Sequence, residues 1–359
     1  MDVMIAGGGT GGHLFPGLAL AQELRRRDSA CRVLFVGTSR GIETRAVPRA
    51  GFDLALLPVS GLRRKSFLGL VAGLVRLPWA LVRAASLVRR FRPQLAVSVG
   101  GYAAGPAVLA ARLLRVPCVV MEQNAVPGLT NRILGRLARL VIAALPVQGF
   151  ARDKVRVLGN PVRKELVAVR EAPYAPTQPL RVLVFGGSQG ARALNDVMIA
   201  LAPRLTTLAT APHIVHQTGA QDFERVQQAY ASAGVDGIEV VAFIDAMAEA
   251  YRDADLVLCR AGATTVAELT TCGRPAILVP YPFAVDDHQS ANAQTLADEG
   301  AALHIPERDF TSERLLHELS HLAANPERLV TMATRARALG RPHAAADIVD
   351  ALEAEVRRV

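Results

Sequence analysis

A glycine-rich turn between a short apolar run and a helical segment most constrains what this chain can fold into. Residues 3–6 are apolar, residues 7–12 include five glycines, and apolar residues recur at helical spacing from Leu14 to Leu24. This order predicts a strand, a tight turn and a helix. Glycines let the backbone approach a ligand closely, and the unpaired N–H groups of a helix start attract anions such as a diphosphate. His13, directly after the glycines, adds a ring suited to acid–base chemistry.

The same turn fits a second pattern, because Gly7, Gly9 and Gly12 have the spacing of a dinucleotide-binding fingerprint. A nicotinamide-dependent dehydrogenase would carry an acidic residue about 20 residues further on, at the end of the second strand. We expect that strand at residues 32–36, and no carboxylate follows it until Glu43. The sequence therefore disfavours a nicotinamide cofactor. A ligand rich in oxygen atoms and a β–α turn without a ligand remain as alternatives.

The opening pattern returns half a chain later. Residues 180–185 are expected to form a strand, residues 186–190 a glycine turn with a serine hydroxyl, and a helix is expected from Ala191. Two such units in 359 residues predict an α/β protein with two Rossmann-like, doubly wound domains that face each other across a cleft.

The expected boundaries follow from this repeat. The first domain is predicted over residues 1–162 and the second over residues 163–341, with a C-terminal helix at 342–359 that packs back on the first domain. Residues 171–179 are rich in proline and polar side chains without periodicity, which makes them the expected linker.

Polar side chains follow the predicted strands at residues 94–99 and 117–121. Tyr102 comes after a second glycine turn, and Glu122 and Asn124 come after the next strand. Ligands of parallel α/β sheets gather at the carboxyl ends of the strands. Tyr102, Glu122 and Asn124 are therefore candidate wall residues of the cleft at the first glycine turn.

Charge is the next constraint, since the formal net charge is +9 and the pI is close to 10. No acidic residue occurs between Leu54 and Met121, and residues 67–83 are apolar with widely spaced arginines. Such a helix can lie on an anionic bilayer, or it can be a core helix with solvated arginines. The candidate membrane patch is Phe67, Leu68, Leu74, Arg76, Trp79 and Arg83. Few aromatic residues and no recognisable module argue against nucleic acid.

The remaining composition excludes several classes. No apolar run reaches the length of a membrane span, and the four scattered cysteines lack the spacing of a zinc site or a disulfide framework, which indicates a reducing cytoplasmic setting. Asp253 and Asp255 have the spacing of a metal clamp but stand where a helix passes into a strand. His288 beside two aspartates lacks convincing ligand spacing.

A set of motifs in fixed order carries a family resemblance. They are residues 8–19, 100–102, 122–124, 128–131, 159–163, 186–192, 243–245, 260–268, 287–289 and 292–293. Together they resemble the MurG family of peptidoglycan N-acetylglucosaminyltransferases, which are glycosyltransferases of GT-B type in family 28. The chain departs from the family pattern at Ala246, where aspartate is common, and at His288, where some members have glutamine.

The resemblance implies an inverting transfer of N-acetylglucosamine from UDP-N-acetylglucosamine to the C4 hydroxyl of N-acetylmuramoyl-pentapeptide-diphosphoundecaprenol (lipid I), which forms lipid II. It implies no cofactor and no protein-bound metal. It also implies a peripheral position on the cytoplasmic face of the bacterial inner membrane, through the patch defined above, and contacts there with other cell-wall synthesis proteins.

The resemblance also carries roles over by matching position. The donor-binding residues it implies are Thr10, Gly11, Gly12, Asn124, Arg163, Ser188, Ile244, Ala263, Thr264, Thr265, Val266, Ala267, Glu268 and Gln289. Among them, Ile244 would meet the uracil, Glu268 the ribose hydroxyls and Gln289 the sugar hydroxyls. The acceptor-side residues would be His13, Tyr102, Glu122 and Asn124. His13 is the candidate base or orients the acceptor diphosphate; the alternative is that its ring only packs the glycine turn.

Three rival functions stay open at this point. One is a GT-B enzyme with another acceptor, and the second is a UDP-sugar epimerase or hydrolase of the same fold. The third is a nucleotide-binding module without catalytic activity.

Overall fold

The computed structural model of the chain describes residues 1–9, 11–39, 41–59, 67–187, 189–208 and 210–358, and for residues 67–77 it describes the backbone alone. The chain divides into two compact units. The first unit comprises Met1–Val162 together with His343–Val359, and the second comprises Arg163–Pro342.

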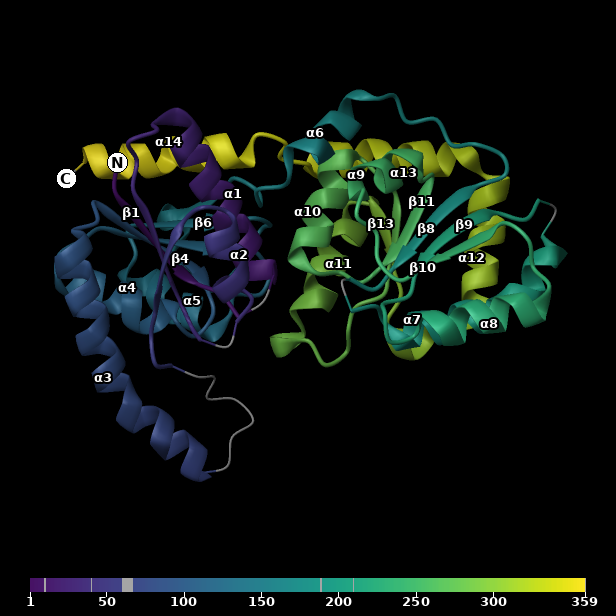
Figure 1. The fold of residues 1–359 in the computed structure, drawn as a ribbon. Helices are drawn as coiled ribbons and strands as arrows, with labels where there is room; N and C mark the ends of the chain where they lie inside the picture. Colours follow the sequence, from purple (N-terminus) through teal and green to yellow (C-terminus); the bar gives the residue numbers. More distant parts are fainter. Residues whose placement is uncertain (10, 40, 60–66, 188, 209, 359) are drawn as a thin grey trace. The chain divides into compact units, whose positions relative to one another are not determined.

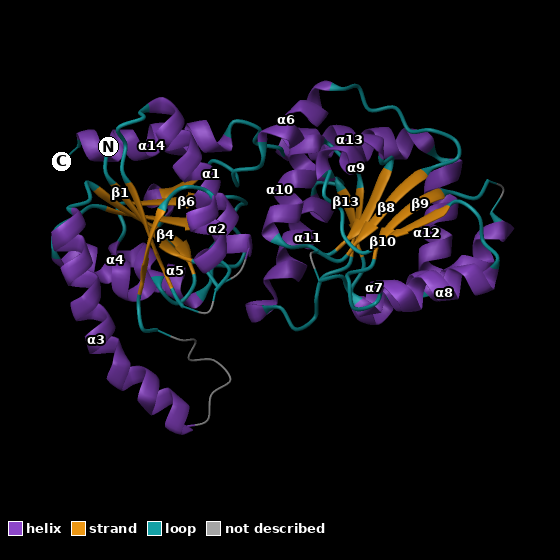
Figure 2. Cartoon of the chain, viewed as in Figure 1, coloured by secondary structure: helices purple, strands orange, loops and turns teal. Residues whose placement is uncertain are grey.

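The first unit is built on a parallel seven-stranded sheet with the order β3-β2-β1-β4-β5-β6-β7. Its strands are drawn in orange in Figure 2. Its strands are β1 (Val3–Gly7), β2 (Val33–Gly37), β3 (Asp53–Leu56), β4 (Leu95–Gly100), β5 (Cys118–Glu122), β6 (Leu140–Ala143) and β7 (Val155–Val157). Four of them, β1, β4, β5 and β6, are buried along their whole length, which explains their continuous apolar runs.

Helices cover both faces of this sheet (Figure 1). They are α1 (Gly11–Arg27), α2 (Glu43–Arg49), α3 (Phe67–Phe91), α4 (Ala104–Leu113), α5 (Leu129–Leu137) and α14 (Ala344–Arg357), with a 3-10 turn at Arg152–Lys154. One core lies between the sheet and α1 with α14, and the other lies between the sheet and α3, α4 and α5.

The C-terminal helix α14 belongs to the first unit although it follows the second in sequence. Ile348, Val349 and Leu352 are fully buried in the core beside α1. Arg27 at the end of α1 pairs with Asp350 at 2.5 Å. The N-terminal fold is therefore completed by the last residues of the chain.

The second unit has a parallel six-stranded sheet with the order β10-β9-β8-β11-β12-β13. The strands are β8 (Arg181–Phe185), β9 (His213–Gln217), β10 (Ile238–Val241), β11 (Leu256–Cys259), β12 (Ala276–Leu278) and β13 (Ala302–His304). The α-helices are α6 (Lys164–Glu171), α7 (Arg192–Leu201), α8 (Phe223–Ala233), α9 (Met247–Asp253), α10 (Ala263–Cys272), α11 (His288–Asp298), α12 (Ser312–Ala324) and α13 (Pro326–Leu339). The 3-10 turns are Ala202–Thr207, Val285–Asp287 and Glu307–Asp309.

The segment predicted as a linker, residues 171–179, is not one. It lies inside the second unit, and side-chain hydrogen bonds fix it to Asp255, directly before β11. The Tyr174 hydroxyl donates to the backbone carbonyl of Asp255 at 2.6 Å, and the Thr177 hydroxyl donates to its carboxylate at 2.7 Å. A segment rich in proline lacks backbone donors, so it reads as a linker in sequence even where side chains pin it to a core.

Each sheet has one point at which the strand order reverses direction. In the first unit it lies between β1 and β4, and in the second between β8 and β11. Loops that leave two neighbouring strands toward opposite faces open a crevice there, and ligands of doubly wound folds bind in it. The glycine turns after β1 and β8 both stand at these switch points.

Candidate functional site

The glycine turns after β1 and β4 interlock at the first switch point. A Cβ on Gly7 would come within 2.2 Å of the Gly100 carbonyl oxygen, and a Cβ on Gly101 within 2.5 Å of the Gly8 oxygen. All four glycines have positive φ angles, between 87° and 146°. Side chains are therefore excluded here, because the two backbones occupy the space that a Cβ needs.

A buried carboxylate from α2 holds the first turn from the other side. Glu43 is 1% exposed and accepts hydrogen bonds from the N–H groups of Gly9 and Thr38, each at 2.9 Å. Gly8 and Gly41 leave room for it, since a Cβ on either would lie within 3 Å of the carboxylate. Burial raises the pKa of Glu43, but hydrogen bonds from these N–H groups, its own N–H and the Thr38 hydroxyl outweigh burial and hold the pKa below its ordinary value. The chain's own negative charge thus occupies the Gly9 N–H, where a dinucleotide phosphate would bind.

His13 lies in the first turn of α1, and its ring meets Gly100 at the end of β4 and Gln123 directly after β5. Its Nδ1 atom is 3.2 Å from Oε1 of Gln123. On the β4 side, a Cβ on Gly100 would lie 2.9 Å from both Nδ1 and Cε1 of the ring. The ring edge with Nδ1 is therefore packed and hydrogen-bonded, and Nε2 is the nitrogen that can reach a ligand.

Glu122, predicted on the acceptor side, is hydrogen-bonded to the loop after β5. It is 2% exposed, and its carboxylate accepts from the Asn124 N–H, the Gly128 N–H and the Asn131 side chain at 3.0 to 3.2 Å. The Ser98 hydroxyl donates to the Asn131 side-chain oxygen at 2.8 Å. A residue that lines a ligand site and a residue that holds a loop can both follow a strand. Sequence position alone therefore could not distinguish these two roles for Glu122.

The other predicted residues of the first unit surround this loop cluster. Tyr102 is 51% exposed just after β4. Asn124 is half-buried and donates its side-chain N–H to Glu122 at 3.3 Å. Gly11 and Gly12 begin α1, so their N–H groups belong to the turn that has no intrahelical acceptor. Thr10 lies outside the described residues.

Interlocked glycines recur in the second unit, where the turn after β8 packs against the loop after its neighbour β9. A Cβ on Gly190 would meet the Thr218 oxygen at 1.9 Å, and a Cβ on Gly219 would meet the Gln189 oxygen at 2.2 Å. Behind this pair, His216 is fully buried between the Tyr230 hydroxyl at 2.7 Å and the Asn195 side-chain oxygen at 3.0 Å. Burial lowers the pKa of His216 to about 4, so the ring is neutral at pH 7. Ser188 lies outside the described residues.

Helix α10 places its N-terminus at the carboxyl end of β11, on the other side of the second switch point. The Oγ1 atom of Thr264 is buried there and has no hydrogen-bond partner among the described residues. Unpaired N–H groups and an unpaired hydroxyl together suit an anionic, oxygen-rich ligand. Ala263 and Val266 are buried, so only their backbones can serve a ligand, while Thr265 and Ala267 are half-buried.

Glu268, one turn into α10, is a buried carboxylate with two partners. It is 9% exposed; Oε2 accepts from the Tyr251 hydroxyl at 3.1 Å, and Oε1 lies 3.6 Å from Arg163. Burial raises the pKa of Glu268, although Arg163 and the Tyr251 hydroxyl act in the opposite direction. A buried carboxylate with spare lone pairs is suited to accept hydrogen bonds from neutral hydroxyls.

The last two predicted donor contacts lie on the loop after β10 and in the first turn of α11. Ile244 is half-buried after β10. Gln289 is the second residue of α11, and its side-chain oxygen accepts a hydrogen bond from the Tyr281 N–H at 3.0 Å. The side-chain amide nitrogen therefore points away from Tyr281 N–H. His288 binds the Val285 carbonyl through Nδ1 at 2.6 Å.

The described part of the chain contains no cluster of metal-ligating side chains. No group of three or more His, Cys, Asp or Glu residues there could hold an ion. Asp255, of the pair with clamp spacing, is 2% exposed and accepts from the Arg181 N–H at 2.8 Å. It stabilises the start of β8.

The described part of α3 has two different faces. Ala80, Ala84 and Val88 are buried against the unit. Trp79 and Val82 are 60% and 61% exposed, and Arg83 is exposed beside them. The helix is therefore a core helix on one side and an apolar, basic surface on the other. The side chains of Phe67, Leu68, Leu74 and Arg76 lie outside the described residues.

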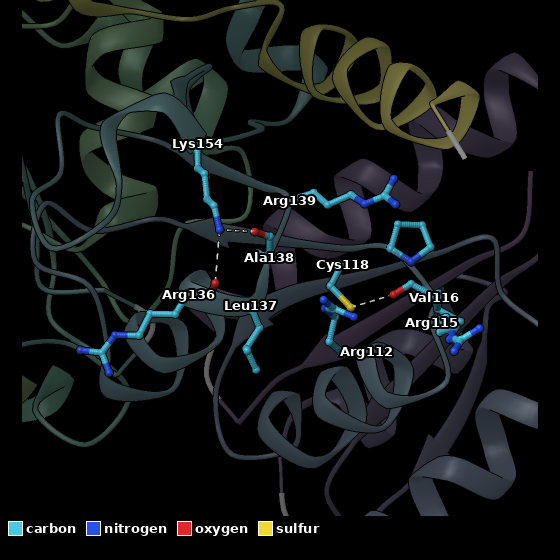
Figure 3. Close-up of a pocket in the computed structure, with 10 residues that line it drawn as sticks. Arg112, Arg115, Val116, Cys118, Arg136, Leu137, Ala138, Arg139 and Lys154 are labelled. Atoms are coloured by element: carbon cyan, nitrogen blue, oxygen red, sulfur yellow. Dashed lines mark hydrogen bonds between the residues drawn. The ribbon is translucent and has the colours of Figure 1, made fainter.

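A basic cavity of about 440 Å³ lies at the amino ends of β5 and β6 (Figure 3). The glycine turns lie at the opposite, carboxyl ends of the strands. The basic lining residues of the cavity are Arg112, Arg115, Arg136, Arg139 and Lys154. Lys154 donates to the backbone carbonyls of Arg136 and Ala138. None of the described lining residues is acidic, so the cavity favours anions.

Comparison with known proteins gives matches along the whole chain. Residues 3–143 match the glycosyltransferase family 28 N-terminal domain, and residues 181–351 match the family 28 C-terminal domain. A protein from Myxococcus xanthus is 48% identical over 98% of this chain and 92% of its own length. A protein from Geobacter sulfurreducens is 43% identical over 100% of both. Both are named UDP-N-acetylglucosamine–N-acetylmuramyl-(pentapeptide) pyrophosphoryl-undecaprenol N-acetylglucosamine transferase.

Solved structures also match this chain over nearly its whole length. The crystal structure of MurG from Acinetobacter baumannii superimposes with a TM-score of 0.81 at 36% identity, covering 98% of this chain and 99% of that one. The calicheamicin glycosyltransferase CalG4 (TM-score 0.69, 19% identity, 99% and 98% covered) shares the fold. So does a UDP-GlcNAc 2-epimerase from Neisseria meningitidis (0.66, 14%, 98% and 99% covered).

Proposed function

This chain belongs to glycosyltransferase family 28, and we propose that it catalyses the reaction for which its relatives are named. It has the GT-B fold and transfers N-acetylglucosamine from UDP-N-acetylglucosamine to lipid I, which forms lipid II for peptidoglycan synthesis. The observation that carries this conclusion is 48% identity over 98% of the chain to a relative of that name. The epimerase likeness, at 14% identity, concerns the fold alone.

The second unit binds the donor. The α10 N-terminus and Thr264 hold the diphosphate, Glu268 accepts from the ribose hydroxyls, and Ile244 and Gln289 contact the uracil and the sugar. Two supports are the Thr264 hydroxyl, which has no partner among the described residues, and the position of α10 at the switch point. Helix N-termini stabilise the negative charge that builds up on the departing UDP.

The first unit presents the acceptor. His13 Nε2 takes the proton from the C4 hydroxyl, and the resulting oxygen attacks C1 of N-acetylglucosamine from the face opposite UDP. The C1–O bond to UDP breaks, and the anomeric centre inverts. The packed Nδ1 edge of His13 supports this assignment, since it leaves Nε2 for the substrate.

Transfer of labelled N-acetylglucosamine from UDP-N-acetylglucosamine to a short-chain lipid I analogue tests the function. We expect robust transfer that persists with EDTA, because no metal takes part in the proposed mechanism. Release of the sugar to water, or its epimerisation without an acceptor, would instead favour an epimerase or hydrolase.

We also place the enzyme on an anionic membrane surface through the first unit. No helix in the described part of the chain is long and apolar enough to span a bilayer. Trp79 and Val82 on α3, Leu113 on α4 and Ile133 on α5 expose apolar side chains on neighbouring helices. The basic cavity lies where α4 and α5 end. Apolar insertion with surrounding arginines is the pattern of interfacial binding.

Trp79→Ser/Arg83→Glu should therefore reduce pelleting with phosphatidylglycerol vesicles about 10-fold or more, since each basic residue contributes about 1 kcal/mol at an anionic surface. Arg308→Glu, at a side chain 84% exposed in the second unit, is the control for charge reversal. Pelleting that falls equally in both variants would argue against a specific surface.

A further inference from the structure

Gln123 is a buried amide that the mechanism above does not use. It follows Glu122 at the end of β5 and is 2% exposed. Its Oε1 atom lies 3.2 Å from His13 Nδ1, and its Nε2 atom is buried without a partner among the described residues. Its one described side-chain hydrogen bond therefore goes to the candidate base.

The backbone that carries Gln123 is fixed on both sides. The preceding residue, Glu122, is locked by the Gly128 N–H and the Asn131 side chain. The following residue, Asn124, donates its own N–H to the Glu122 carboxylate at 3.0 Å. The Gln123 side chain thus leaves a segment that hydrogen bonds within the chain hold in place.

An amide oxygen only accepts hydrogen bonds, so the His13 nitrogen facing it must carry the proton. A neutral imidazole with its proton on Nδ1 has its lone pair on Nε2, which is the form that a general base requires. The opposite tautomer would present an N–H to the acceptor hydroxyl and could not remove its proton. The tautomer is therefore as important to catalysis as the place of the ring.

We propose that Gln123 is a positioning residue that holds His13 in the Nδ1–H tautomer, with Nε2 free to take the acceptor proton. This inference rests on the proposed role of His13 as base. Gln123 itself does not touch the reacting atoms; Gly100 completes the arrangement, because any side chain there would displace the ring edge that Gln123 binds.

Two substitutions at Gln123 separate hydrogen bonding from packing. Gln123→Met keeps the length of the side chain and removes the acceptor, whereas Gln123→Glu keeps an acceptor oxygen. We expect kcat to fall about 100-fold in Gln123→Met, the scale of general-base catalysis. KM for both substrates should change less than about 3-fold, and Gln123→Glu should keep kcat within about 10-fold of wild type.

The tautomer is read directly by ¹⁵N NMR of histidine-labelled protein, with the His13 signals identified by their loss in His13→Ala. Wild type and Gln123→Glu should show a protonated Nδ1 and an unprotonated Nε2, and Gln123→Met a mixture. Gln94→Met is the control. Gln94 Oε1 also accepts one hydrogen bond, from Asp2 N–H, but it lies at the amino ends of β1 and β4, away from His13.

The outcomes distinguish this inference from the proposed function. A protonated Nε2 in wild type, with Gln123→Glu inactive, would mean that the amide faces His13 through its nitrogen and would overturn the inference. Equal kcat in Gln123→Met and wild type would do the same. If His13→Ala retains transfer, the base assignment fails, and the NMR result still decides the tautomer.

Discussion

His13→Ala should reduce transfer to the lipid I analogue about 1,000-fold while binding of UDP-N-acetylglucosamine remains unchanged. Removal of a positioned general base typically costs 10²- to 10⁴-fold in rate. Donor binding should survive, because the proposed contacts of the uracil, the ribose and the sugar are all in the second unit. The measurement is kcat for transfer together with the donor Kd from calorimetry.

The control for this variant is His213→Ala, which removes an exposed histidine from the second unit. His13 is half-buried, so its loss should change the thermal midpoint only slightly, and an intact melting transition shows that the loss of rate is not unfolding. Transfer by His13→Ala within a few-fold of wild type would assign the ring to packing of the glycine turn, and another group would have to take the proton.

The strand–turn–helix order at the start of each unit was predictable from sequence, because apolar runs and glycine clusters are local signals. The structure places both glycine turns at switch points of parallel sheets, and the C-terminal helix α14 lies in the first unit. The linker prediction at residues 171–179 was wrong, because side-chain bonds from Tyr174 and Thr177 to Asp255 are not visible in local composition.

The partners of the site residues were harder to predict for a related reason. Gln123 lies 110 residues from His13, and Glu43 lies 34 residues from Gly9. Sequence patterns identified the residues at strand ends, but the strand order decides which of them meet. Glu43 appeared in the sequence only as the first carboxylate after the second strand, whereas in the structure its carboxylate holds the glycine turn. The ligand contacts of all these site residues remain predictions, and Thr10 and Ser188 also lie outside the described residues.

The second large effect is expected at Glu268. Glu268→Ala should raise KM for UDP-N-acetylglucosamine about 100-fold and change kcat less than a few-fold. Hydrogen bonds to a charged group contribute about 1.5 to 3 kcal/mol each, and about 3 kcal/mol corresponds to about 100-fold. The ribose is remote from the reacting carbon, so the loss is one of uniform binding and appears in KM.

Tyr251→Phe is the matched control, since it removes the one described hydroxyl bond to Glu268 and leaves the carboxylate in place. Its donor KM should stay within a few-fold of wild type. The alanine variant leaves the buried Tyr251 hydroxyl without this acceptor, so its thermal midpoint should fall, and kinetics must be measured well below it. Lost turnover with an unchanged donor KM would refute the ribose assignment.

The raised pKa of Glu268 adds a pH dependence with a definite sign. The ionised carboxylate is the form with all its lone pairs available to the ribose hydroxyls, and protonation replaces one of them by a donor. Because burial raises the pKa, this protonation begins at a higher pH than for an exposed glutamate. Donor KM should therefore rise as the pH falls through the raised pKa. Glu268→Gln cannot titrate, so its donor KM should be higher at neutral pH and flat over the same range; an equal pH dependence in both proteins would place the titrating group elsewhere.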